Sequence, residues 1–287
     1  MSNRSFPFEI HNISLADGMD IAYVDEGKGS CTLLFIHGLG SNLKAWQKNI
    51  ATLRKDYRCI ALDLPGYGQS VGSETFAYNM SFFAAVVREL IDKLGLKKVV
   101  LVGHSMGGQI ALHTALKDTR KLEKLVLVAP AGFETFTEKE RAWFQTIFTP
   151  AMLQATPEEQ LVKNFHLNFH RFPEDAQFMI DDRLQLRQTP AYAAYCAMIS
   201  KCVQGMLNEP VFDQLPNVKL STLIFFGDND QLIPNGFLHA SLTTSEVARS
   251  GQEALPRGQL KMLPEAGHFV QWEQAEQLNK ALKEFLK

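Results

Sequence analysis

The most constraining feature of the chain is a serine flanked by glycines, in the run Gly-His-Ser-Met-Gly at residues 103–107. An apolar, β-branched stretch precedes it, and a run of small and apolar residues follows it. This pattern is typical of a nucleophile elbow, a sharp strand-to-helix turn that exposes a catalytic hydroxyl. The glycines two positions either side of Ser105 leave room for the strained backbone of such a turn. The turn would also place the backbone N–H of Met106 at a helix N-terminus, where it favours a developing negative charge.

Two segments further along the chain supply the partners that such a serine needs. A serine hydroxyl becomes a strong nucleophile when a base takes its proton, and an acid usually orients that base. A buried-strand pattern at 220–226 ends in an acidic loop at 227–234, and a further strand at 259–263 ends in a loop that holds His268. The chain order is therefore serine, acid, histidine. This order argues against the alternative that Ser105 is an idle residue in a glycine-rich turn.

Together these motifs resemble those of the α/β-hydrolase fold superfamily over nearly the whole chain. Within it, they most resemble capped serine esterases and lipases of the monoacylglycerol-lipase kind. The run His-Gly-Leu-Gly at 37–40 is similar to the family's oxyanion loop, and residues 63–70 are similar to its Asp-x-Pro-Gly-x-Gly-x-Ser turn. Residues 227–234 and 266–269 match its acid and histidine loops.

The resemblance implies a role for each matched residue. Ser105 is the expected nucleophile, His268 the general base and Asp230 the orienting acid. Asp228 competes for the acid role, and the family pattern favours Asp230 because it lies four residues before a proline. The backbone N–H groups of Leu39 and Met106 are the expected oxyanion hole.

The alternation of apolar strands and amphipathic helices predicts an α/β fold, with a mostly parallel eight-stranded sheet and helices on both faces. The expected strands are 8–15, 19–25, 32–36, 58–62, 98–102, 123–128, 220–226 and 259–263, and the expected helices are 42–54, 79–94 and 105–117. Residues 134–210 lack a strand pattern, and residues 249–258 are expected to form a loop. We therefore expect a core domain of residues 1–133 and 211–287, with 134–210 as a helical cap (lid) inserted after the sixth strand.

The cap would roof a pocket over the sheet edge, because pockets commonly form at such junctions. The aromatic Phe133 is expected in this pocket because it lies just past a strand end. Trp143 and Phe148 of the cap are expected to line it as well, together with Ile233 and Phe269 beside the acid and the histidine. These side chains favour a small, partly apolar substrate.

Composition excludes several other classes of function. The formal net charge is −2 and no basic stripe is present, so nucleic acid is not an expected partner. No run reaches the ~18 apolar residues of a membrane-spanning helix, and the N-terminus lacks a signal-peptide core, so we expect a cytoplasmic protein. The four cysteines fit no metal pattern and are expected to be free thiols.

No cofactor or metal is expected either. The glycine-rich loops match neither G-x-G-x-x-G nor G-x-x-x-x-G-K, so a nucleotide is not indicated. His166 and His170 have the spacing of two ligands on one helix, but no third ligand follows at metal spacing.

The expected function is hydrolysis of a carboxylic ester, with thioester and amide bonds as variants. Three alternatives remain open: a C–C bond hydrolase of the meta-cleavage-product type, a cofactor-free perhydrolase or haloperoxidase, and a receptor-like protein that binds its ligand with slow turnover. A serine at position 105 excludes dehalogenases and epoxide hydrolases, which use an aspartate there.

Overall fold

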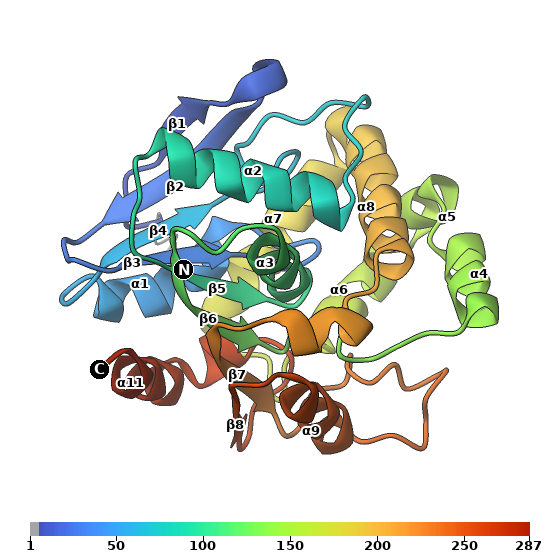
Figure 1. Ribbon diagram of the computed structural model, residues 1–287. Coiled ribbons are helices and arrows are strands. Elements are labelled where there is room, and N and C mark those ends of the chain that lie inside the picture. The colour runs from blue at the N-terminus through green and yellow to red at the C-terminus, as the bar shows by residue number, and fades with distance from the viewer. Residues whose placement is uncertain (1–5) are drawn as a thin grey trace.

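The computed structural model describes residues 6–287, within which eight strands form one sheet (Figure 1). The strands follow the order β1-β2-β4-β3-β5-β6-β7-β8. Strand β2 pairs antiparallel with β1 and with β4, and the remaining neighbours pair in parallel. Their bounds are β1 His11–Ser14, β2 Asp20–Glu26, β3 Thr32–Ile36, β4 Arg58–Leu62, β5 Val99–His104, β6 Leu122–Val128, β7 Ser221–Gly227 and β8 Gly258–Leu263.

The burial of the strands explains why the sequence pattern located them. The central strands β3 and β5 are buried at every residue, as expected for parallel strands with helices on both faces. The edge strands β1 and β8 alternate between exposed and partly buried residues along most of their length. The predicted mostly parallel eight-stranded sheet is confirmed.

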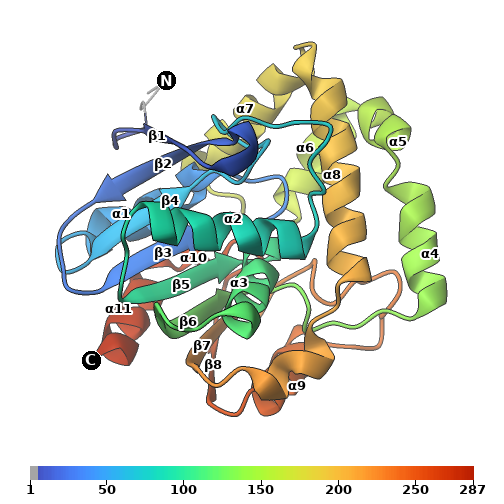
Figure 2. The same cartoon turned by 45° about the horizontal axis from the view of Figure 1, so that its top comes forward.

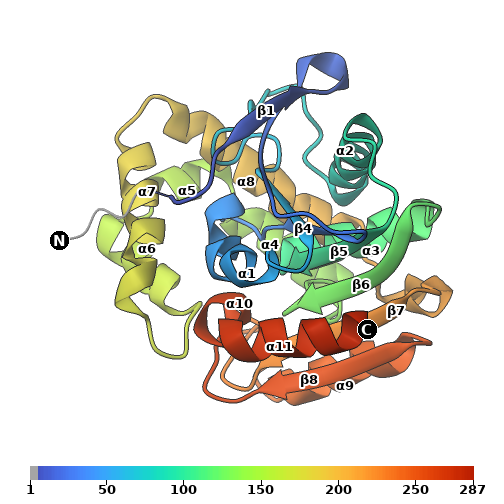
Figure 3. The same cartoon turned by 90° about the vertical axis from the view of Figure 1, so that its left-hand side faces the viewer.

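Helices cover both faces of this sheet. Helices α1 (Gln47–Leu53) and α11 (Ala275–Leu286) pack together on one face, whereas α2 (Met80–Lys93) and α3 (Met106–Lys117) pack together on the other (Figure 3). The short helix η1 (Ala16–Gly18) joins β1 to β2. A second short helix, η2 (Leu43–Trp46), immediately precedes α1. Helix α10 (Val270–Glu273) follows the last strand.

One expectation is wrong. The segment 249–258 was expected to be a loop, but helix α9 (Thr244–Ala254) runs through most of it. The helix begins with a capping box, in which the Thr243 side chain accepts from Glu246 N and the Glu246 side chain accepts from Thr243 N. This reciprocal cap stabilises a helix start in a polar sequence.

Between β6 and β7 the chain forms helices that gather at one end of the sheet (Figure 2). No strand lies among residues 134–210, all of which the structure describes. The helices here are α4 Glu138–Ile147, α5 Pro150–Ala155, α6 Glu158–His166, η3 Glu174–Ala176, α7 Gln177–Arg187 and α8 Ala191–Asn208, and η4 Phe212–Asn217 leads back to the sheet.

Two expectations concern the whole chain. All four cysteines are free, as the sequence predicted. Among residues 6–287, no helix combines the length and the apolar character that crossing a membrane requires.

Candidate active site

Ser105 lies at the turn between β5 and α3 in a strained backbone conformation. Its φ of 52° is in the region that side-chain-bearing residues rarely adopt. The sheet holds this conformation, because Ser105 N donates to Val128 O at 3.0 Å and Ser105 O accepts from Ala131 N at 3.0 Å. A Cβ placed on Gly107 would lie 2.3 Å from Ile36 O, so the turn requires a glycine there. The structure therefore has the strand–turn–helix geometry expected of a nucleophile elbow.

The acid and histidine loops meet above the ends of β7 and β8. His268 Nδ1 donates to Asp230 Oδ2 at 2.8 Å, and both side chains are buried. The other carboxylate oxygen accepts from Leu232 N at 2.8 Å and Ile233 N at 3.1 Å. Asp228, the competing acid, has an exposed side chain. The Asp230 carboxylate is thus positioned to fix the His268 ring with Nδ1 protonated and Nε2 available as a base.

Ser105 and His268 line one cavity, although no hydrogen bond joins Ser105 Oγ to the imidazole in the described chain. Catalytic hydrogen bonds are often long in a free enzyme and shorten when substrate binds. The arrangement can therefore transfer a proton between the two side chains once substrate is present.

A second histidine supports the first from behind. His104 Nε2 donates to the backbone carbonyl of His268 at 3.0 Å, so this nitrogen carries the proton. Burial, together with the neighbouring His268 ring, holds the pKa of His104 well below its usual range. His104 therefore stays neutral and fixes the His268 backbone.

The loop after β3 lies directly against Ser105. A Cβ placed on Gly38 would be 3.0 Å from Ser105 Cβ, so a glycine is what allows this close approach. The Gly38 carbonyl accepts from His37 Nδ1 at 2.8 Å and from Ser41 N at 3.2 Å. In a trans peptide the carbonyl and the next N–H point in opposite directions, so the Leu39 N–H points away from these two donors.

His37 is held neutral in this position. Its Nε2 accepts from Leu64 N at 3.0 Å, which leaves the proton on Nδ1 for the Gly38 carbonyl. Burial lowers the pKa of His37 to about 4. The N–H of Leu39 and that of Met106, the first residue of α3, make no hydrogen bond within residues 6–287. Both donors are therefore available to a negatively charged oxygen.

Asp63 holds the neighbouring turn rather than the reacting groups. Its two carboxylate oxygens accept from Leu43 N and Gln69 N, each at 2.8 Å. Burial raises the pKa of this carboxyl group to about 6. A Cβ placed on Gly68 would lie 2.0 Å from Asp63 Oδ2, which explains the glycine.

The cavity that contains Ser105 has a volume of about 630 Å³ and mixed walls. Three of the five predicted pocket residues line it: Phe148, Ile233 and Phe269. Other apolar walls, none of them among the five predicted pocket residues, include Phe136, Phe144, Val203, Met206, Leu207 and Phe212. Charged side chains also line it, among them Arg141 on α4, which donates to Phe136 O.

The other two predicted pocket residues do not line this cavity. Phe133 is 3% exposed and packs against Phe226. It lies so close to Gly251 that a Cβ on this glycine would be 2.0 Å from the Phe133 ring. Trp143 stacks on Phe237, with 5.0 Å between ring centroids. Phe144, the next residue of α4, lines the cavity instead of Trp143.

Several ties between the helical segment and the sheet were not predicted from the sequence. Glu273 accepts from Gly267 N next to His268, and also from the backbone N–H groups of His170 and Arg171. The side chain of His239 bridges Glu134 and Glu140. These contacts join residues far apart in the sequence, so no local pattern reveals them.

His166 and His170, which have ligand spacing in the sequence, do not belong to a cluster suited to a metal ion in the described residues. His166 stacks on Phe172, with 4.4 Å between ring centroids. Within residues 6–287, no group of three or more histidine, cysteine, aspartate or glutamate side chains has a geometry suited to a metal ion.

A model of the alpha/beta hydrolase fold family matches residues 32–275. An uncharacterised hydrolase of Bacillus subtilis, YugF, is 30% identical over 274 residues, covering 94% of this chain and 96% of the relative. The dihydrolipoyllysine-residue acetyltransferase component of the acetoin cleaving system of Cupriavidus necator is 28% identical over 272 residues, covering 94% of this chain and 67% of the relative. Among solved structures, a probable hydrolytic enzyme from Pseudomonas aeruginosa superposes with a TM-score of 0.86 at 22% identity, covering 99% of this chain and 96% of that one.

Proposed function

The chain belongs to the alpha/beta hydrolase fold family, and on that basis we propose that it is a serine hydrolase that cleaves carboxylic esters through an acyl-enzyme. The observation that carries the proposal is the shared cavity of Ser105 and His268, with Asp230 hydrogen-bonded behind the histidine. Hydrolysis is the activity that the name of the Bacillus subtilis relative gives. The apolar part of the cavity supports a substrate with an apolar acyl group.

In the proposed reaction, Ser105 Oγ attacks the ester carbonyl carbon and its proton passes to His268 Nε2. Asp230 stabilises the imidazolium that forms. The carbonyl oxygen becomes an oxyanion, to which the N–H groups of Leu39 and Met106 donate. As the tetrahedral intermediate collapses, His268 returns the proton to the departing alkoxide, which leaves as the alcohol. Water then attacks the acyl-enzyme by the same steps and releases the acid.

We also propose that residues 134–210 act as a cap on a core of residues 1–133 and 211–287. The cavity is lined both by this segment, through residues such as Phe148, and by the core, through residues such as Ile233. All proposed triad and oxyanion residues belong to the core. The cap would therefore select the substrate while the core performs the chemistry.

A panel of p-nitrophenyl esters of increasing chain length, combined with a fluorophosphonate probe, tests the proposal. We expect rapid turnover of the esters and covalent labelling of Ser105. Tight ligand binding without turnover would favour a receptor-like role instead. Turnover of a vinylogous diketone, with the esters left intact, would favour a C–C bond hydrolase.

A further inference from the structure

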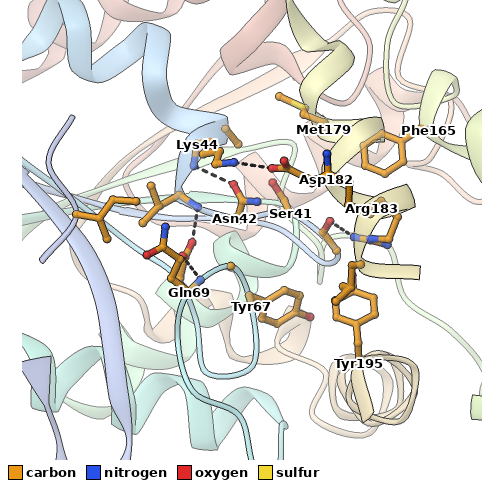
Figure 4. A pocket seen from close by; sticks show the side chains of 18 of the residues that line it. Ser41, Asn42, Lys44, Tyr67, Gln69, Phe165, Met179, Asp182, Arg183 and Tyr195 are labelled. Carbon is orange, nitrogen blue, oxygen red and sulfur yellow. Dashed lines mark hydrogen bonds and ion pairs between the residues drawn. The ribbon is translucent and has the colours of Figure 1, made fainter. Parts of the chain in front are cut away.

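A second cavity, of about 330 Å³, lies behind the oxyanion loop, between that loop and helices α7 and α8 (Figure 4). Its walls include Gly40 and Ser41 of the loop, and Arg183 and Tyr195 of the helical segment. A side chain that reaches the loop from this side can hold it from behind.

Arg183 is one group that does. Its Nη2 donates to the Gly40 carbonyl at 2.5 Å (Figure 4). The guanidinium lies over the Tyr195 ring, 4.5 Å from its centroid, and 5.8 Å from that of Phe165. Within residues 6–287, no acidic side chain pairs with Arg183, because its neighbour Asp182 pairs instead with Lys44. The contacts of the Arg183 guanidinium are therefore with the Gly40 carbonyl and with the rings of Tyr195 and Phe165.

The peptide geometry carries this contact to the oxyanion hole. Arg183 fixes the carbonyl of the peptide that joins Gly40 to Ser41, and the N–H of that same peptide donates to the Gly38 carbonyl at 3.2 Å. The Gly38 carbonyl in turn sets the direction of the Leu39 N–H, because the two belong to one planar trans peptide. Two linked peptide planes thus connect a side chain on α7 to the proposed oxyanion donor.

We propose that Arg183 is a positioning residue, through which the helical segment holds the oxyanion loop in its active orientation. The kinetic part of this inference rests on the proposed serine hydrolase function. Gly40 has a φ of +68°, and its Cβ, if present, would lie 3.2 Å from Arg183 Nη2. The loop therefore approaches the arginine in a conformation that favours glycine.

The chain offers a matched pair of variants. R183M removes the donor to Gly40 and keeps an apolar stem, whereas R183K keeps a positive donor. D182N breaks the adjacent tie between α7 and the core, Asp182 to Lys44 at 2.7 Å, without touching the Gly40 peptide. A difference between R183M and D182N therefore reports on the loop and not on general docking of α7.

On p-nitrophenyl acetate, we expect R183M to lower kcat by at least about tenfold with little change in KM, because a misdirected donor loses transition-state binding. D182N should stay within about twofold of the wild type, as partly exposed ion pairs contribute little, and R183K should recover most of the loss. An alkyl boronic acid, which forms an anionic tetrahedral adduct on the serine, should lose affinity in parallel with kcat.

Amide hydrogen exchange tests the same proposal without requiring that the protein turn over a substrate. In the free protein, the Ser41 N–H should exchange faster in R183M than in the wild type or D182N, because its acceptor moves. Unchanged exchange and kcat in R183M, or equal losses in D182N, would overturn the positioning role. If the wild type neither turns over esters nor reacts with fluorophosphonate, the proposed function fails, and the exchange comparison still decides whether Arg183 holds the loop.

Discussion

The strand ends of the sheet and the helices between β6 and β7 are built differently. Helix α3, which begins beside Ser105, buries ten residues in succession from Met106 to Ala115. In contrast, α4 buries Phe144, α6 buries Leu161, and α5 buries none of its residues. The strand ends can therefore hold reacting groups in fixed positions, whereas α4, α5 and α6 are sparsely packed and depend on a few polar ties, unlike α8, which buries eight residues. We expect substitutions in the first region to affect reactivity. In the second region, substitutions of cavity-lining residues should affect selectivity, whereas Arg183 should affect reactivity because it contacts the oxyanion loop.

The largest effect should come from Ser105→Ala. Ester hydrolysis should fall by roughly 10³-fold or more, because the members of a triad act as a unit. His268→Ala should be as severe, and kcat/KM on p-nitrophenyl acetate measures both. Circular dichroism and thermal unfolding should remain close to those of the wild type.

The two candidate acids provide the control for this prediction. Asp230→Asn should also cripple the enzyme, because Asp230 orients His268, whereas Asp228→Asn replaces an exposed side chain. A crippled Asp228→Asn beside a mild Asp230→Asn would show that the acid assignment is wrong.

The next largest effect should be on the free energy of unfolding at low pH, through His37 in the oxyanion loop. Burial holds the pKa of His37 at about 4, below its ordinary value of 6.5, so the unfolded chain takes up a proton before the folded one does. The stabilisation is complete above pH 6.5 and is lost as the pH falls toward 4. Between pH 7 and 4.5 the loss from this one group is about 2–3 kcal/mol.

His37→Asn tests this dependence, since it keeps a donor near Nδ1 but does not titrate. Urea unfolding at several pH values should show a smaller loss of stability on acidification in the variant than in the wild type. His104 contributes in the same direction in both proteins, because its pKa is also depressed. Identical pH slopes would contradict the assigned role of His37 burial.

The same contrast explains what the sequence could predict. Ser105 follows the buried strand β5 and His268 follows the edge strand β8, and both lie in local motifs, so pattern and chain order were enough to predict their roles. Local patterns cannot reveal which face of a cap helix turns inward, and Trp143 was therefore expected in a cavity that it does not line. The contact of Arg183 with Gly40 joins distant segments, and no spacing along the chain indicates it.

A smaller effect should separate two aromatic residues of the helical segment. Phe148 lines the cavity, and Trp143 does not. Since each buried methylene contributes about 0.8 kcal/mol, Phe148→Ala should lower kcat/KM for long-chain esters by roughly tenfold and leave the acetate ester little changed. Trp143→Ala should keep the wild-type chain-length profile. If both variants show the same profile, the cavity is not where the acyl chain binds.

The smallest effect should come from the junction between the helical segment and the acid loop. His239 lies between Glu134, at 2.5 Å, and Glu140, at 3.2 Å, and Glu246 lines the same surface hollow. The pKa of His239 is raised because the hydrogen bonds and charges of Glu134 and Glu140 outweigh its desolvation. A histidine whose folded pKa is raised contributes stability that is fully present below pH 6.5 and is lost as the pH rises above 6.5, through the raised folded pKa. The sign is therefore opposite to that of His37.

We expect the amides of α4 to exchange faster as the pH rises from 6 to 9, beyond the intrinsic pH dependence of exchange, because neutral His239 no longer bridges two carboxylates. His239→Gln should remove this additional dependence. Asp182→Asn, at the tie on α7, should keep it, since that pair does not contact His239. Equal pH dependence in wild type and His239→Gln would mean that this bridge does not hold α4. Loss of the dependence in both variants would mean that the helical segment opens as a single unit, with no separate role for His239.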